Sequence, residues 1–181
     1  MTLLDSDVYG RKLAARFATF DLDHDGTITV GDLEAMARRI LERYELSEAS
    51  AKGKALMAGA RHYFAGLAEA ADTDDDGVLT REEFIGAAGS RLRGNPDGFT
   101  DVIRPWAEAV VAVADVDGDG RVDLAEWTRM LRAMGATEAG APVQARRVDT
   151  DGDGAVSVDE VVASAVSFYI SDEPHDEFGE G

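Results

Sequence analysis

The chain has 181 residues, no cysteine, and 36 acidic against 18 basic residues, which give it a formal net charge of −18. Without cysteine it can form neither a disulfide nor a thiolate metal site, and its acidic balance argues against the basic surface that nucleic acids require. No stretch approaches the ~20 apolar residues of a membrane span, and the N-terminus lacks the basic segment and apolar run of a secretory signal. We therefore expect a cytoplasmic protein that binds neither nucleic acid nor membrane.

Four acidic segments of twelve residues separate helical stretches of the chain. The segments are residues 21–32, 72–83, 115–126 and 149–160. They hold 20 of the 36 acidic residues and two of the 18 basic ones, so the rest of the chain, with 16 of each, is neutral. The charge is therefore concentrated where cations would bind, which distinguishes it from a general solubility feature or an acidic tail.

In the N-terminal half, residues 1–92, apolar residues recur at the helical period on both sides of each segment. Phe17 and Phe20 stand three positions apart at the end of the helix that precedes the first segment, and a second helix follows it. A long helix from about Ser50 to Ala71 should lead into the second segment, with another helix after it.

The clearest helix breaker is the run Arg-Gly-Asn-Pro-Asp-Gly, and we expect a linker over residues 93–99. The C-terminal half, residues 100–181, should begin with a helix near Thr100. Pro105 should either kink this helix or mark its true start. Gly135 should end the helix that follows the third segment. The helix before the fourth segment should be weak.

Each acidic segment begins with the pattern Asp-x-Asp-x-Asp-Gly and ends with an acidic residue at its twelfth position. Calcium prefers six to eight oxygen ligands, and this spacing supplies carboxylates at positions 1, 3, 5 and 12, a carbonyl at position 7 and a sharp turn at the glycine. The pattern is that of the EF-hand calcium loop, and four copies between helices argue against a chance match. The expected ligand residues are Asp21, Asp23, Asp25, Thr27 and Asp32 in the first loop, Asp72, Asp74, Asp76, Val78 and Glu83 in the second, Asp115, Asp117, Asp119, Arg121 and Glu126 in the third, and Asp149, Asp151, Asp153, Ala155 and Glu160 in the fourth.

A bulky aliphatic residue stands at position 8 of every loop, namely Ile28, Leu79, Val122 and Val156. Such residues suit extended backbone, and paired EF-hands join them in a short antiparallel ribbon. The sequence therefore predicts an all-α fold in which two pairs of EF-hands pack into a compact globule, with short β-ribbons between the paired loops.

The first loop departs from the others because it ends with Asp32, where the other three end with glutamate. Glutamate reaches the ion with both carboxylate oxygens, whereas aspartate is one methylene shorter. Magnesium is smaller than calcium and prefers near-ideal octahedral ligation. The first loop should therefore favour Mg²⁺ or bind Ca²⁺ weakly.

The spacing of the loops and the end of the chain carry a resemblance to a known group. The first two loops begin 51 residues apart, a breaker separates the halves, and a Ser-Asp-x-Pro tail follows the last helix. In these features the chain resembles calerythrin and related bacterial EF-hand proteins, which are similar to the invertebrate sarcoplasmic calcium-binding proteins. The resemblance implies a compact calcium buffer or transporter. That group commonly has a degenerate second loop, whereas this chain keeps every acidic ligand there.

Three functional classes fit these loops. A calcium buffer or transport protein would bind three to four divalent ions, act as a monomer and need no protein partner. A sensor would open on binding and expose a methionine-rich groove to a target protein, and a calcium-triggered photoprotein would be an enzyme with a cavity lined by His, Tyr and Trp. Five methionines, three histidines and no Ser-His-Asp or Cys-His set favour a buffer that is not an enzyme. Its tail, residues 171–181, is expected to cover the groove between hands.

Overall fold

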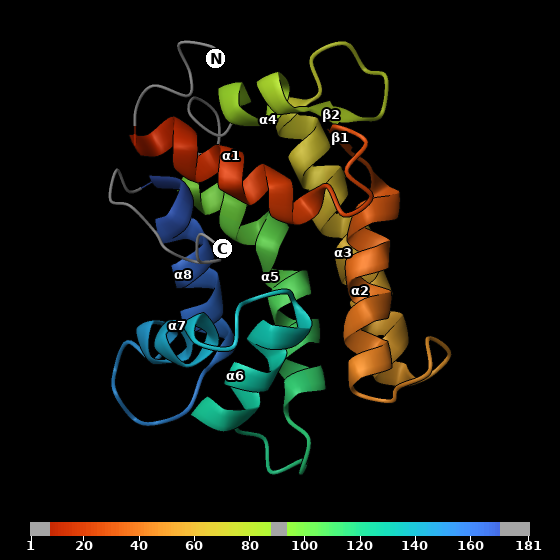
Figure 1. The fold of residues 1–181 in the computed structure, drawn as a ribbon. Helices are drawn as coiled ribbons and strands as arrows, with labels where there is room; N and C mark the ends of the chain where they lie inside the picture. Colours follow the sequence, from red (N-terminus) through yellow and green to blue (C-terminus); the bar gives the residue numbers. More distant parts are fainter. Residues whose placement is uncertain (1–7, 88–93, 171–181) are drawn as a thin grey trace.

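The computed structural model describes residues 8–87 and 94–170, where helices are joined by four acidic loops (Figure 1). The helices are α1 (Val8–Phe20), α2 (Val30–Arg43), α3 (Ala51–Ala71), α4 (Arg81–Ala87), α5 (Pro96–Ala114), α6 (Leu124–Ala133), α7 (Gly140–Val148) and α8 (Val158–Ile170), and the strands are β1 (Thr27–Ile28) and β2 (Leu79–Thr80). Each loop lies between two consecutive helices, so all four helix–loop–helix units form. The predicted all-α, compact EF-hand fold is confirmed.

Short antiparallel contacts pair the loops, as the residues at position 8 predicted. β1 pairs with β2, with Ile28 opposite Leu79. Between the third and fourth loops the N–H of Val156 donates to the carbonyl oxygen of Val122 at 2.7 Å, beside an isolated antiparallel bridge. All four of these side chains are buried. Each pair of loops is therefore anchored to the core through its ribbon.

One hydrophobic core runs through both halves of the chain. Its aromatic rings connect four helices: the ring centroids of Phe20 on α1 and Tyr63 on α3 lie 5.8 Å apart. Phe99 on α5 lies 6.3 Å from Tyr63 and 4.8 Å from Tyr169 on α8. These are tilted or edge-to-face contacts, which aromatic pairs favour. The two halves therefore pack against each other through their apolar faces.

The closest link between the halves is the packing of α3 along α5, which a glycine permits. A Cβ on Gly59 would lie 3.1 Å from the carbonyl oxygen of Pro105 and 3.1 Å from Cα of Trp106. We expect Gly59→Leu to push the helices apart and lower the free energy of unfolding by about 1–3 kcal/mol, the usual cost of overpacking. Urea unfolding measures the loss, with the exposed neighbour Ala58→Leu as control. Equal losses in both variants would contradict this account of the contact.

The helix expected to begin near Thr100 begins four residues earlier, at Pro96. Asn95 caps it, because its side chain accepts a hydrogen bond from the N–H of Gly98 at 3.2 Å. Proline is favoured at the first helical position, where a missing N–H has no cost. The predicted start of this helix at Thr100 was thus wrong by four residues. Pro105 lies inside α5 and does not begin it.

Other boundaries agree with the sequence. Gly135, with φ of 110°, ends α6, and its N–H donates to the carbonyl of Arg132 at 3.1 Å. α7 has nine residues and lacks a side-chain cap at Ala139, as expected of a weak helix. The tail over residues 171–181 lies outside the described residues, and the division of the chain at a linker over residues 93–99 stays a prediction. None of the helices in the described part is long and apolar enough to cross a membrane.

Candidate metal centre

The four loops turn in the same way. The glycines at position 6 have φ between 82° and 92°, in the left-handed region that suits glycine, and their N–H groups donate to the carboxylate at position 1 over 3.0 to 3.2 Å. A second left-handed residue at position 4, with φ from 58° to 74°, was not predicted. The residues there are His24, Asp75, Gly118 and Gly152. The two glycines at this position, in the third and fourth loops, are the sequence feature that indicates a left-handed residue there.

Carboxylates converge in every loop. Three of the expected ligand residues in each loop bring carboxylate oxygens within 4.8 Å of one another. These sets are Asp21, Asp23 and Asp25; Asp72, Asp74 and Asp76; Asp115, Asp117 and Glu126; and Asp149, Asp151 and Glu160. The sets combine positions 1, 3 and 5 in the first pair of loops and positions 1, 3 and 12 in the second. All donors are hard oxygens, the kind that Ca²⁺ and Mg²⁺ prefer.

The acid at position 12 is held the same way in all four loops. One oxygen of Glu83 accepts the N–H of Thr73 at position 2, and the other accepts the N–H of Thr80 at position 9, both at 3.0 Å. Glu126 and Glu160 make the same two contacts in their loops. Asp32 also makes them, at 3.1 and 2.9 Å, with one methylene fewer. The closing acid is thus fixed by the loop backbone at both ends.

The expected ligands at positions 5 and 7 are joined by hydrogen bonds. The carboxylate at position 5 accepts the N–H of position 7 at 2.8 to 3.0 Å, which links Asp25 to Thr27, Asp76 to Val78, Asp119 to Arg121, and Asp153 to Ala155. The side chain of Arg121 also reaches the neighbouring loop, where its guanidinium lies 3.2 Å from Asp153. Both groups are exposed, so this ion pair contributes little to stability.

Two carboxylate oxygens give a direct test of whether a cation fits. The Oδ1 atoms of Asp72 and Asp149, at position 1 of the second and fourth loops, are buried and have no hydrogen-bond partner among the described residues. A buried acceptor without a partner carries a desolvation penalty of about 1–3 kcal/mol, and more when charged. A cation among the converging oxygens removes that penalty. The residues present therefore fit a hard divalent ion.

The acids of the second loop differ in how readily they lose a proton. Repulsion from the neighbouring Asp76 carboxylate raises the pKa of Asp74 above its ordinary value. Hydrogen bonds from the backbone N–H groups of Thr73 and Thr80 lower the pKa of Glu83 to about 2. For Glu160, burial acts to raise the pKa, but N–H donors from Ser157 and Thr150 outweigh it and lower the pKa. Glu83 and Glu160 thus keep their charge to lower pH than an ordinary glutamate.

The depressed pKa of Glu83 predicts a pH dependence of stability in the metal-free protein. A carboxyl with a lower pKa in the folded state stabilises the fold above its unfolded pKa, and the contribution is lost as the pH falls through the folded value. We expect wild type to have a higher free energy of unfolding than Glu83→Gln at pH 7. This difference should disappear as the pH falls from about 4.5 to the folded pKa of about 2. Urea unfolding at several pH values in chelator measures it. A difference that does not change with pH would contradict the assignment.

Comparisons with known proteins agree with this geometry. The EF-hand domain pair model matches residues 11–89, and the EF hand model matches residues 112–131 and 146–163. The solved structure of a Streptomyces coelicolor calcium-binding protein is 42% identical, with a TM-score of 0.85 over 90% of this chain and 98% of that one. The chain belongs to the EF-hand calcium-binding proteins. This EF-hand protein is also 28% identical to calerythrin from Saccharopolyspora erythraea over 160 residues, 88% of this chain and 90% of calerythrin. The expected resemblance to that group is confirmed.

A more distant likeness concerns the fold alone. Calcium-loaded apo-aequorin from Aequorea victoria is 18% identical to this EF-hand protein, with a TM-score of 0.72 over 92% of both chains. The likeness shows that the two chains share a fold. It carries no statement about light emission or any other reaction.

The shorter acid that closes the first loop of this EF-hand protein makes a testable difference. We expect Asp32→Glu to raise the calcium affinity of the first loop by about tenfold, equivalent to about 1.4 kcal/mol, because a second carboxylate oxygen can then reach the ion. The mirror variant Glu83→Asp should lower calcium affinity in the second loop and shift it towards Mg²⁺. Calorimetric titration with each ion measures both. An unchanged affinity in Asp32→Glu would refute the argument from side-chain length.

Proposed function

We propose that this EF-hand protein is a calcium buffer or transport protein that binds three to four divalent ions and stays closed when it does so. The proposal rests on how the two halves fill each other. Phe20 and Tyr63 of one half meet Ile103 and Trp106 of the other around a small cavity of about 30 Å³. The apolar faces that a sensor must expose to a target are thus already occupied.

The surface supports the same proposal. The large apolar side chains that are exposed within the described residues are Val30, Val116, Val143 and Ile170. They belong to three different loops or helix starts and to the end of α8, and single exposed apolar residues are ordinary on a protein surface. A helix from a partner needs a continuous apolar groove, which these four scattered side chains do not supply.

A calcium-dependent regulator is the second candidate, and one comparison favours it. The Streptomyces coelicolor relative, at 42% identity, is described as mediating calcium-dependent regulation. For this chain to act in that way, calcium would have to separate the halves and uncover the aromatic core for a target protein. The two proposals therefore differ in one measurable quantity, the apolar surface exposed after calcium binds.

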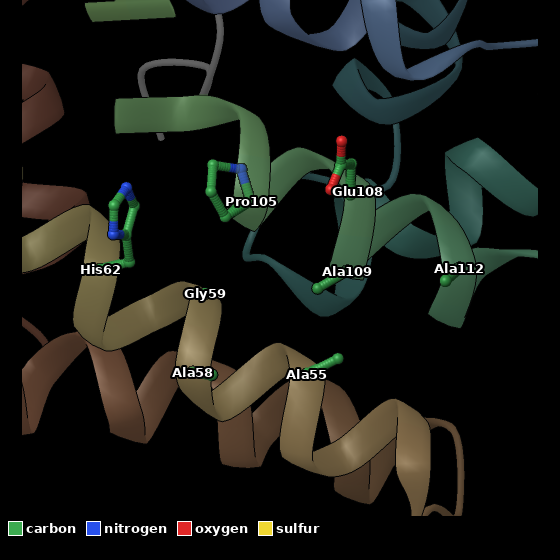
Figure 2. A pocket seen from close by; sticks show the side chains of 8 residues that line it. All are labelled: Ala55, Ala58, Gly59, His62, Pro105, Glu108, Ala109 and Ala112. Carbon is green, nitrogen blue, oxygen red and sulfur yellow. The ribbon is translucent and has the colours of Figure 1, made fainter. Parts of the chain in front are cut away.

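A photoprotein-like enzyme is disfavoured by the shape of the interior. Aromatic rings fill the centre of the molecule. An open groove of about 520 Å³ lies between α3 and α5, lined mainly by small side chains and with two polar ones, His62 and Glu108 (Figure 2). Figure 2 shows His62 projecting from α3 beside Pro105 of α5, and the Nε2 of His62 lies 3.4 Å from the carbonyl oxygen of Asp101 on α5. An open groove of this kind does not enclose a reactive ligand, so we propose no enzymatic activity.

The proposed ligands are the twenty loop residues given above, with Ca²⁺ in the second, third and fourth loops and Ca²⁺ or Mg²⁺ in the first. The charge supports this distribution, because the loops carry the whole net charge of −18 and four divalent ions would offset 8 of those charges. The monomeric state and the cytoplasmic location stay predictions. Size-exclusion chromatography with light scattering, in calcium and in chelator, tests the first of them.

An apolar dye distinguishes buffer from regulator. We expect calcium to leave the fluorescence of a dye such as ANS unchanged or lower than in chelator, because the halves remain packed. Gly59→Leu, which forces α3 from α5, serves as a control for dye binding to an opened molecule, and Ala58→Leu as its matched control. A several-fold rise in dye fluorescence with calcium in the wild type would favour the regulator.

A further inference from the structure

A lysine from the N-terminal half caps the helix that leads into the third loop. The Nζ of Lys52 donates to the carbonyl oxygen of Asp115 at 2.9 Å. Lys52 stands in the first turn of α3, where the helix dipole disfavours a cation, and it reaches the C-terminal end of α5, where the dipole favours one. Asp115 is both the C-cap of α5 and the first residue of the third loop. The N-terminal half therefore holds the end of the entering helix.

The helix that leaves the third loop is held from the same side. Arg39 on α2 donates through Nε to the carbonyl oxygen of Ala133, the last residue of α6, at 3.0 Å. A Cβ added to Gly135 would lie 3.0 Å from a guanidinium nitrogen of Arg39. The end of α6 therefore packs closely against the Arg39 side chain. In the opposite direction, Arg129 on α6 donates to the carbonyl oxygen of Arg43, the last residue of α2, at 3.2 Å. The same guanidinium lies 4.5 Å from the centroid of a tyrosine ring on the N-terminal half.

We propose that Lys52, Arg39 and Arg129 are positioning residues for the third calcium site. The carboxylates of Asp115, before α6, and Glu126, within it, must converge for the ion to bind, and their oxygens lie within 4.8 Å. Holding the ends of α5 and α6 fixes that approach before the ion arrives, and a preorganised site binds more tightly. By linkage, calcium in the third loop must strengthen the packing of the two halves by the same factor.

The sign of the effect distinguishes positioning from simple electrostatics. A positive charge at the third loop, such as Lys52 beside Asp115, repels a divalent cation, so its removal would by charge alone raise calcium affinity. Loss of positioning lowers it. The proposal rests on calcium binding to the third loop and is independent of the choice between buffer and regulator, which the dye experiment tests separately.

A titration that resolves the loops tests the proposal. The N–H of the glycine at position 6 of each loop donates to the first ligand, so the amide resonances of Gly120 and Gly77 report the third and second loops in one sample. In a chelator-buffered calcium titration of the triple variant Arg39→Gln, Lys52→Gln, Arg129→Gln, we expect the affinity of the third loop to fall by about fivefold or more, the lower range of coupling between sites. The second loop should change by less than about twofold, within the spread expected of uncoupled positions.

Two control variants separate the loss of these contacts from the loss of positive charge. Arg11→Gln, Lys54→Gln, Arg147→Gln removes three exposed cations that form no ion pair across the halves within residues 8–87 and 94–170, and should leave the affinity of the third loop unchanged or slightly higher. Lys52→Arg keeps the donor and should preserve affinity. If the triple variant does not fold, Lys52→Gln alone is titrated, and a measurable fall in the third loop is expected. An unchanged or higher affinity of that loop in the triple variant, or in Lys52→Gln in its place, overturns the proposal.

Discussion

Calcium is expected to raise the melting temperature of this EF-hand protein steeply. In chelator the loops hold the full net charge of −18 at close range, and ions that bind the folded chain alone convert their affinity into stability. A site with a dissociation constant on the order of 10⁻⁷ M, at 100-fold excess of free calcium, adds about 2.7 kcal/mol. Three such sites add about 8 kcal/mol, which for a chain of this size raises the melting temperature by about 15–30 °C.

Scanning calorimetry in chelator, magnesium and calcium measures this shift. Salt provides a control, because 0.5 M KCl, about three times physiological ionic strength, screens repulsion between exposed carboxylates. Salt should therefore raise the melting temperature in chelator and reduce the difference in melting temperature between the metal-free and calcium-bound protein. A melting temperature that is the same in chelator and in saturating calcium would refute the coupling between loop charge and stability.

The second large effect is expected at the closing glutamates. Glu83→Gln replaces the carboxylate with a neutral amide, which has one ligand oxygen in place of two and no negative charge. We expect the calcium affinity of the second loop to fall by about 100-fold, equivalent to about 2.7 kcal/mol. Its neighbour Glu82 has the same charge and is exposed at a position outside the ligand set. Glu82→Gln is therefore a charge-matched control that should change the affinity by less than about threefold. Calorimetric titration compares the two.

The same comparison applies to the fourth loop, with Glu160→Gln as the ligand variant. Its control, Asp159→Asn, removes an adjacent charge that lies 2.8 Å from Arg104 on α5. Losses of equal size in ligand and control variants would mean that total loop charge governs affinity, and the assignment of roles by loop position would be wrong.

The loops could be predicted because their geometry is local. Twelve consecutive residues fix the turn at Gly26 and the convergence of Asp21, Asp23 and Asp25, and no contact from elsewhere in the chain is needed. The pairing of loops also followed from sequence, since Ile28 and Leu79 suit a ribbon wherever two loops meet. Each such prediction depends on position within a motif.

Other features could not be predicted because they depend on competing local signals or on distant residues. Asn95 caps α5 and Pro96 begins it, although glycine, asparagine and proline together predict a break in the helix, and periodicity alone does not place the boundary. The contact between Lys52 and Asp115 spans 63 positions of the chain. Nothing in the spacing of charges around Lys52 indicates that it caps another helix. The packing of one half against the other therefore had to come from the structure.

A count of bound ions tests the central claim, that all four loops are divalent-ion sites, most directly. Native mass spectrometry across a calcium titration, repeated with competing magnesium, gives the number of ions and the order of their binding. The account predicts up to four divalent ions, with three tight calcium sites in the loops that begin at Asp72, Asp115 and Asp149, and a first loop that binds calcium more weakly or holds magnesium. Two or fewer ions at millimolar calcium would contradict it.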